Sequence, residues 1–374
     1  MDIELGFNYM NARTSKVVIF ILIAVICVML SLTSTSTAKG QAIVGQVSGG
    51  SIQNGPGTAS TNHPPPHLIA TCLSDYLPLS AAYDPADGLI YVALGVSPPE
   101  ISILKSPCTL LEAITISTGE MVAGVAYDPL TKEVVAIDSI GEAYVLQGFS
   151  IVKRVSLIDS TSYSFCPSFP TWDAALGAML ITDPCRGGID ILQLTIAGGA
   201  THEKVRISAF DSNNVPTGVL VAAGYIFCPG SLGTDVFNDR TLRYMGSFPV
   251  AGQTAYTPLT WDPVNQTVAV GLATGISSEE VYFLEVGGIA SHKFAFHNLR
   301  VHGILDGGVG GIGYSPANQN IYVTAAGGDD VWILGPTGLL SHVYLQPPLG
   351  MSNVAYDSGN QDEYVCGFSL YVVS

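Results

Sequence analysis

The feature that most constrains the fold of this chain is a short motif that returns about every 44 residues. In each copy a small residue precedes an aromatic residue, which is followed by Asp and often by Pro. Six copies are clear: Ala82-Tyr83-Asp84-Pro85, Ala126-Tyr127-Asp128-Pro129, Thr171-Trp172-Asp173-Ala174, Thr260-Trp261-Asp262-Pro263, Gly313-Tyr314-Ser315-Pro316 and Ala355-Tyr356-Asp357-Ser358. Their aromatic residues are 44, 45, 89, 53 and 42 residues apart, and the interval of 89 holds a degenerate seventh copy near residues 217–222. Seven units of this length are typical of the blades of a β-propeller.

Each unit divides into four short apolar segments, here named A to D in chain order. In the second unit these are residues 122–127, 133–137, 143–146 and 151–157. The Asp-Pro pair ends segment A in a tight turn, because Asp bonds its own backbone there and Pro presets φ. With 41 Gly and 22 Pro in the chain, long helices are disfavoured. We therefore predict an all-β fold of seven four-stranded antiparallel blades.

The two ends of the repeat region predict how the circle closes. The last copy has three strands, at residues 353–356, 363–366 and 370–373, and lacks the fourth. Residues 68–72 precede the first strand A without a blade of their own. We predict that this N-terminal segment supplies the outer strand of the last blade, which would remove an open junction.

At these residues the chain resembles a known family, the extracellular β-propellers of the YVTN-repeat type. The resemblance is carried by Gly313-Tyr314-Ser315-Pro316 with Ile321-Tyr322-Val323-Thr324-Ala325, and by Tyr83-Asp84-Pro85 with Ile90-Tyr91-Val92-Ala93. It covers about residues 68–374, and the fourth copy departs from it most because it lacks the aromatic-Asp-Pro anchor. Such propellers are found among microbial surface-layer and other exported proteins. The resemblance implies a fold and a compartment, and it implies no particular activity.

The N-terminus has the order of a secretory signal peptide. Arg13 and Lys16 precede an apolar run from Val17 to Leu32, and Ser36 and Ala38 suit the −3 and −1 positions of a cleavage site. We predict a signal peptide at residues 1–38, a flexible Gly/Ser/Thr/Pro linker at 39–66 and the propeller at 67–374. The alternative is an uncleaved anchor, in which case the chain contacts the membrane through this segment alone. In both cases the propeller is extracellular or on the cell surface.

Six cysteines follow the apolar run, and an even number in an exported chain predicts disulfides. Six allow 15 pairings. Cys166 and Cys185 fall in loops on the same side of one blade, so we predict that they pair. Asn265-Gln266-Thr267 is the N-glycosylation acceptor pattern of the chain.

The strand A segments contain no Asp, Glu, Lys, Arg, His or Cys before the anchor aspartate, at residues 79–83, 122–127, 169–172, 218–222, 258–261, 311–314 and 352–356. Acid–base or metal chemistry in the channel needs such groups close to a substrate. We therefore predict no catalytic residue, metal site or cofactor there, with weak Ca²⁺ binding possible in loops such as residues 327–330.

An acidic residue stands just before strand C in six units, and together these residues predict an acidic ring on one face: Glu100, Glu142, Asp190, Asp235, Glu280 and Asp330. With 14 Lys and Arg against 30 Asp and Glu, and a net charge of −16, nucleic acid is excluded as a partner. Such a ring would attract a basic partner protein, and the predicted partner is a protein or another component of the envelope. The competing interpretation is that each carboxylate solvates a strand start and blunts a sheet edge.

These observations predict an exported or cell-surface propeller that acts as a binding or structural module of the cell envelope. The alternative function is an exported lyase, hydrolase or oxidoreductase whose site is built by loops over the channel mouth, with Asp75, His302 and Asp306 as candidates.

Overall fold

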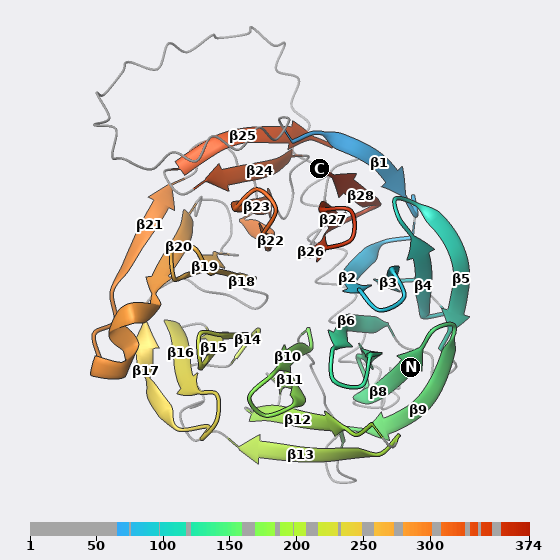
Figure 1. The fold of residues 1–374 in the computed structure, drawn as a ribbon, viewed down its shortest axis with the longest axis horizontal. Coiled ribbons are helices and arrows are strands. Elements are labelled where there is room, and N and C mark those ends of the chain that lie inside the picture. The colour runs from blue at the N-terminus through green and yellow to red at the C-terminus, as the bar shows by residue number, and fades with distance from the viewer. Residues whose placement is uncertain are drawn as a thin grey trace, which may run out of the picture. The chain divides into compact units, whose positions relative to one another are not determined.

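The computed structural model describes residues 66–374, except for residues 75, 97, 117–120, 159–168, 184–187, 197, 207–215, 231–232, 249–257, 273–279, 301–307, 326–329, 336–337 and 346–352. The described strands form seven antiparallel sheets of four strands each. The sheets are arranged as blades around a central axis, with the first strand of each blade innermost (Figure 1). The predicted all-β, seven-bladed β-propeller is confirmed.

The four strands of each blade follow one another in the sequence, except in blade 7. Blade 1 is β2 (Pro78–Asp84), β3 (Leu89–Leu94), β4 (Glu100–Lys105) and β5 (Thr109–Thr115); blade 2 is β6 (Val122–Asp128), β7 (Glu133–Asp138), β8 (Glu142–Gln147) and β9 (Ser150–Ser156); blade 3 is β10 (Thr171–Asp173), β11 (Ala178–Asp183), β12 (Gly188–Leu194) and β13 (Ala200–Arg206); blade 4 is β14 (Leu220–Ala222), β15 (Tyr225–Gly230), β16 (Gly233–Asn238) and β17 (Tyr244–Phe248). Blade 5 is β18 (Leu259–Asp262), β19 (Thr267–Gly271), β20 (Glu280–Glu285) and β21 (Phe296–Arg300), with the 3₁₀ helix η1 (Val286–Ser291) before β21; blade 6 is β22 (Val309–Ser315), β23 (Asn320–Ala325), β24 (Asp330–Gly335) and β25 (Gly338–Tyr344); blade 7 is β26 (Val354–Asp357), β27 (Asp362–Cys366), β28 (Leu370–Val373) and β1 (Leu68–Cys72).

The anchor aspartate builds the turn between strands A and B. In blade 2, Oδ1 of Asp128 accepts a hydrogen bond of 2.8 Å from the backbone N–H of Leu130, and the carbonyl of Asp128 accepts one of 2.8 Å from the N–H of Lys132. Lys132 closes the turn with a φ of +59°, in the left-handed region. The same five-residue turn closes blade 1 at Gly88, with a φ of +67° and a bond of 2.9 Å from its N–H to the carbonyl of Asp84. The repeated motif is therefore a repeated turn.

The anchor residues also join neighbouring blades. The hydroxyl of Tyr127 in blade 2 donates a hydrogen bond to the Asp84 carboxylate in blade 1, and Tyr83 of blade 1 donates in the same way to Asp357 of blade 7. Burial and the negative charge of Asp84 raise the pKa of Tyr127, so its hydroxyl stays protonated and able to donate at neutral pH. Each such pair ties the inner edge of one blade to the next.

The core lies between the blades and is made mainly by strands B and C. All six residues of β3 are buried, and Tyr91 of β3 packs with Ile103, Val134 and Tyr144 in one cluster across blades 1 and 2. The Tyr91 hydroxyl reaches the turn between β8 and β9 of blade 2, where it donates to the Gly148 carbonyl at 3.0 Å. Fully burying a large apolar side chain contributes about 1.5–3 kcal/mol, so these interfaces supply much of the stability.

The propeller closes as the sequence predicts. β1 pairs antiparallel with β28, with Leu68 opposite Val373 and Cys72 opposite Leu370. The N–H of Ser374 donates to the His67 carbonyl at 3.1 Å and continues the pairing past the strand ends. The outer strand of the last blade is therefore the first strand of the chain.

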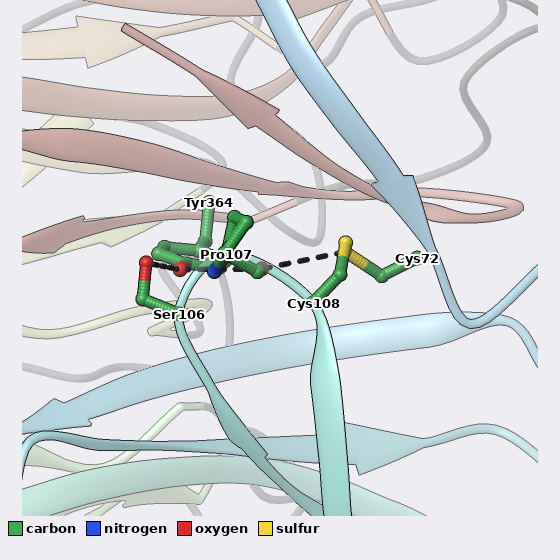
Figure 2. Close-up of a disulfide and its surroundings, with 5 residues drawn as sticks. All are labelled: Cys72, Ser106, Pro107, Cys108 and Tyr364. Atoms are coloured by element: carbon green, nitrogen blue, oxygen red, sulfur yellow. Dashed lines mark hydrogen bonds between the residues drawn. A yellow bond between two sulfur atoms is a disulfide. The ribbon is translucent and has the colours of Figure 1, made fainter.

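A disulfide links this closing strand to the next blade. Cys72, at the end of β1, is bonded to Cys108, which directly precedes β5 of blade 1, with a Cα–Cα distance of 5.5 Å (Figure 2). Beside it, the Tyr364 hydroxyl of β27 donates to Ser106 Oγ at 3.0 Å. The predicted pair Cys166 and Cys185 lies outside the described residues. The spacing of cysteines left 15 pairings open, and only the closure of blade 7 by β1 brings Cys72 to Cys108.

We expect loss of the disulfide to lower stability by about 4 kcal/mol, because it closes a loop of 36 residues. Thermal unfolding of the wild type with and without reductant, beside the double variant Cys72→Ser/Cys108→Ser, measures this. Reductant should lower the Tm of the wild type by more than that of the variant, in which the predicted pair Cys166 and Cys185 is still present. A wild type that is indifferent to reductant would contradict the pairing of Cys72 with Cys108.

Candidate functional site

The two faces of the propeller carry different connections. One face, here called the loop face, bears the connections from strand B to strand C and those from each blade to the next strand A. The opposite face, here called the turn face, bears the A–B and C–D turns. The antiparallel register places the start of strand C on the loop face, since Glu100 at the start of β4 pairs with Leu94 at the end of β3 and with Thr115 at the end of β5.

The six acidic positions lie at the loop-face end of their blades, but not at the same depth. Glu100, Glu142 and Asp330 are first residues of strand C and are half-buried. Glu280 is also a first residue, and its side chain lies outside the described set. The expectation that all six directly precede strand C misses these four by one position and is wrong by more for Asp190 and Asp235, which are third residues of β12 and β16 and are buried. In these two blades strand C begins earlier, at Gly188 and Gly233, so the carboxylate falls inside the sheet.

The buried carboxylates have specific partners. Asp190 is fully buried, and its Oδ1 lies 2.8 Å from Nε2 of His202 on β13. Asp235 lies 3.5 Å from the Tyr244 hydroxyl of β17, and burial followed by the Asp235 charge raises the pKa of Tyr244. These two pairs connect strands C and D within a blade.

A further buried carboxylate shapes the B–C turn of blade 2. Oδ1 of Asp138 accepts the backbone N–H groups of Ile140 at 3.1 Å and Glu142 at 2.8 Å, and its Oδ2 accepts the Tyr144 hydroxyl at 2.9 Å. Several acidic residues near the loop face thus have structural roles inside the blades, which neither interpretation of the acidic ring predicted. Among the ring members whose side chains are described, Glu100, Glu142 and Asp330 partly reach solvent.

Among the loop-face residues that the structure describes, four large apolar side chains that the sequence reasoning missed are exposed. Tyr76 is 48% exposed, Met121 44%, Phe169 36% and Phe368 44%. Three lie one or two residues before strand A of blades 1, 2 and 3, and Phe368 lies in the B–C turn of blade 7. They therefore belong to four consecutive blades, 7, 1, 2 and 3. The signal that could have found the first three was an aromatic or Met one or two residues before strand A, outside any apolar alternation.

One of these side chains is held in place by the backbone of its neighbour. The ring of Phe169 in blade 3 lies on Gly124 of β6 in blade 2, where an added Cβ would come within 2.8 Å of Phe169 Cδ1. A side chain at residue 124 would push the Phe169 ring away. Phe169 is therefore seated across the boundary of blades 2 and 3, next to the strand that follows Met121.

The inner strands carry little reactive chemistry in the part of the chain that the structure describes. There, apart from the anchor tyrosines, their titratable groups are the terminal aspartates at residues 84, 128, 173, 262 and 357, which are all buried. These bind backbone N–H groups of the A–B turns, as Asp262 does with Val264 at 2.9 Å. Across the described ranges, no three His, Cys, Asp or Glu side chains are grouped as a metal site would need.

Several other predicted positions can be placed or set aside. Asn265 is exposed in the A–B turn of blade 5, where its Nδ2 donates to Asp262 Oδ2 at 2.6 Å. The enzyme candidates Asp75, His302 and Asp306, and the loop at 327–329, lie outside the described residues. Among the residues with a described placement, no helix has the length and hydrophobicity to cross a bilayer.

Comparison with known proteins supports the fold and goes no further. No family model matches the chain, and no curated protein does. Among solved structures 1355 chains match. One is the β-propeller domain of Cps50 (Swd1) from Myceliophteria thermophila, which superposes with a TM-score of 0.63 over 83% of this chain and 99% of that one, at 9% sequence identity. The chain has the fold of a β-propeller.

We expect His202→Ala to destabilise the propeller by about 1–3 kcal/mol, because it removes a partner from the buried Asp190 carboxylate. Chemical denaturation measures the change. Thr201→Ala, at the exposed neighbouring position of β13, is the matched control and should change stability by less than about 0.5 kcal/mol. Equal effects of the two substitutions would show that the contact with Asp190 contributes nothing.

Proposed function

We propose that this chain is an exported or cell-surface propeller that binds a protein component of the cell envelope through its loop face. The observation that carries the proposal is the exposure of Tyr76, Met121, Phe169 and Phe368 on that face, over four consecutive blades. Aromatic and Met side chains are enriched at the centres of protein interfaces. A rigid propeller holds them at fixed positions, so little order has to be gained on binding.

Charge supports a basic partner. The chain has a net charge of −16, and Glu100, Glu142 and Asp330 lie half-buried at the loop-face ends of their strands. A protein surface with apolar residues surrounded by Lys and Arg would match both features. Opposite charges of this kind mainly raise the rate of association and fix orientation.

The N-terminal pattern and the disulfide support export. Residues 1–38 have the order of a signal peptide, and Cys72–Cys108 is a bond that forms and persists in oxidising compartments. Surface-layer and other exported propellers of the YVTN type, which the repeat resembles, occupy such compartments. Residues 39–66 would then separate the propeller from the cleavage site or anchor.

Binding is tested with two sets of four substitutions, each of which replaces exposed large apolar side chains on one face. Tyr76, Met121, Phe169 and Phe368 are changed to Ser on the loop face, and the exposed Leu130, Phe149, Val264 and Ile196 are changed to Ser on the turn face. We expect the loop-face variant to lose the envelope partner captured by the wild type, with affinity falling about a hundredfold or more. The turn-face variant should retain it. Equal capture by both variants would refute the loop face as the binding surface.

Export is tested separately on protein from its native cell. N-terminal sequencing is expected to begin at Lys39, and Cys72 and Cys108 should resist alkylation until a reductant is added. An intact N-terminus in the membrane fraction would identify the anchored alternative. Free thiols at both positions in a cytoplasmic fraction would contradict export in either form.

A further inference from the structure

Blade 7 has a carboxylate at a position that is apolar in every other blade. The aromatic position of the anchor is the last-but-one residue of strand A, and in each blade one residue of strand B pairs with it. In blades 1 to 6 that residue of strand B is Ile90, Val134, Met179, Ile226, Val268 and Ile321. In blade 7 it is Glu363, opposite Tyr356. Glu363 is 1% exposed, so its carboxyl group is as buried as the aliphatic side chains it replaces.

Glu363 faces the one blade boundary where the anchor has Ser in place of Asp. Side chains of directly opposite residues point to the same side of a sheet, so Glu363 shares its side with Tyr356. In blade 2 the equivalent Tyr127 faces Asp84 of the preceding blade. At the boundary of blades 6 and 7, the residue of the preceding blade at the position of Asp84 is Ser315. It is 1% exposed and interacts with the Glu363 carboxyl group. Apart from this contact, the buried oxygens of both side chains have no hydrogen-bond partner among the described residues.

We propose that the protonation of Glu363 controls how tightly blades 6 and 7 are held together. At this boundary blade 7 supplies the carboxyl group that the anchor of blade 6 lacks. When it is protonated, the carboxyl group donates a hydrogen bond to Ser315 Oγ, and the side chains buried at the boundary carry no charge. Without the proton, a buried negative charge remains at the boundary with one hydroxyl to stabilise it, and blades 6 and 7 are held less tightly.

The groups around Glu363 favour the protonated form. Burial is the main cause that raises the pKa of Glu363 to about 8; the Ser315 hydrogen bond opposes the rise, and the neighbouring Asp362 adds to it. The other titratable groups that interact with Glu363 are Tyr356 on β26 and Tyr322 on β23, whose own pKa values are raised by burial and then by the Glu363 charge, with the Asn318 hydrogen bond opposing the rise at Tyr322. Burial and then the Asp357 charge raise the pKa of Asp362, and His67 lowers it.

The direction of the pH effect follows from linkage. Because the pKa in the folded state lies above the value of 4.5 for an ordinary Glu, the folded protein binds more protons than the unfolded chain between about pH 4.5 and 8. The stabilisation is therefore complete below about pH 4.5 and is lost progressively up to about pH 8. Blade 7 also contains the closing strand β1 and the exposed Phe368. Weaker packing of blade 7 against blade 6 would therefore affect both the closure of the propeller and the proposed binding face.

The test compares pH profiles of unfolding for the full chain and for Glu363→Gln, which keeps the shape and cannot ionise. We expect the ratio of the wild-type unfolding constant to that of Glu363→Gln to rise with pH, by up to about tenfold per unit, between about pH 4.5 and 8. Glu142→Gln, at the half-buried start of β8, is the control and should follow the wild type. A Glu363→Gln profile parallel to the wild type would overturn the proposal.

A second pair of variants tests whether the Glu363 carboxyl group takes the place of the anchor aspartate that is missing at residue 315. Ser315→Asp alone places two carboxyl groups against each other, so its Tm at about pH 8 should fall below that of the wild type. Adding Glu363→Val restores the arrangement of blades 1 and 2, so the double variant should recover the Tm and lose the pH dependence assigned to Glu363. A double variant no more stable than Ser315→Asp would show that Glu363 does not take the place of the missing aspartate.

Discussion

The pairing of β1 with β28 is the interaction on which the rest of the structure depends. Every blade buries both of its faces against neighbours, so the core consists of boundaries between blades rather than of a single centre. The boundary between blades 7 and 1 forms only when the two ends of the chain meet, across a sequence separation of about 300 residues. Bringing such distant segments together is entropically costly. The disulfide at Cys72 and the Tyr364 hydroxyl bond hold the closing strand and its blade to blade 1.

Charge in this protein is largely built into the blades. Anchor aspartates cap A–B turns and receive tyrosine hydroxyls from the next blade, as Asp84 does from Tyr127. Asp138 organises a B–C turn, and Asp190 binds His202. A net charge of −16 therefore overstates the acidic surface that a partner can reach. Recognition has to combine the remaining half-buried carboxylates with the exposed apolar side chains of the loop face.

The repeat predicted the architecture because period and turn chemistry are local properties. Asp128 and Pro129 determine a turn wherever they occur, and the missing last strand pointed to residues 68–72. The depth of a carboxylate within its sheet was harder to predict. Strand C of blade 3 begins two residues before Asp190, at Gly188, and this places Asp190 in the interior of the sheet rather than at its edge. The partner of Cys72 could not be deduced from spacing, since it depends on which blades are neighbours after closure. Glu363 was visible as a Glu in place of the Ile at position 321, but its meaning required the boundary with Ser315.

Blade 7, where the chain closes on itself, has its own departures from the repeat. Blade 7 has Ser369 where other blades have an acidic residue, Glu363 where they have an aliphatic one, and a strand D taken from the other end of the chain. Six of the seven blade boundaries are formed by segments that are close in sequence. The boundary between blades 7 and 1 lacks that proximity and is held by a covalent bond, and on the other side of blade 7, we propose, a proton controls the contact with blade 6. A change of redox state or pH would therefore act first on blade 7, and Phe368, which lies between its strands β27 and β28, would carry that change to the loop face.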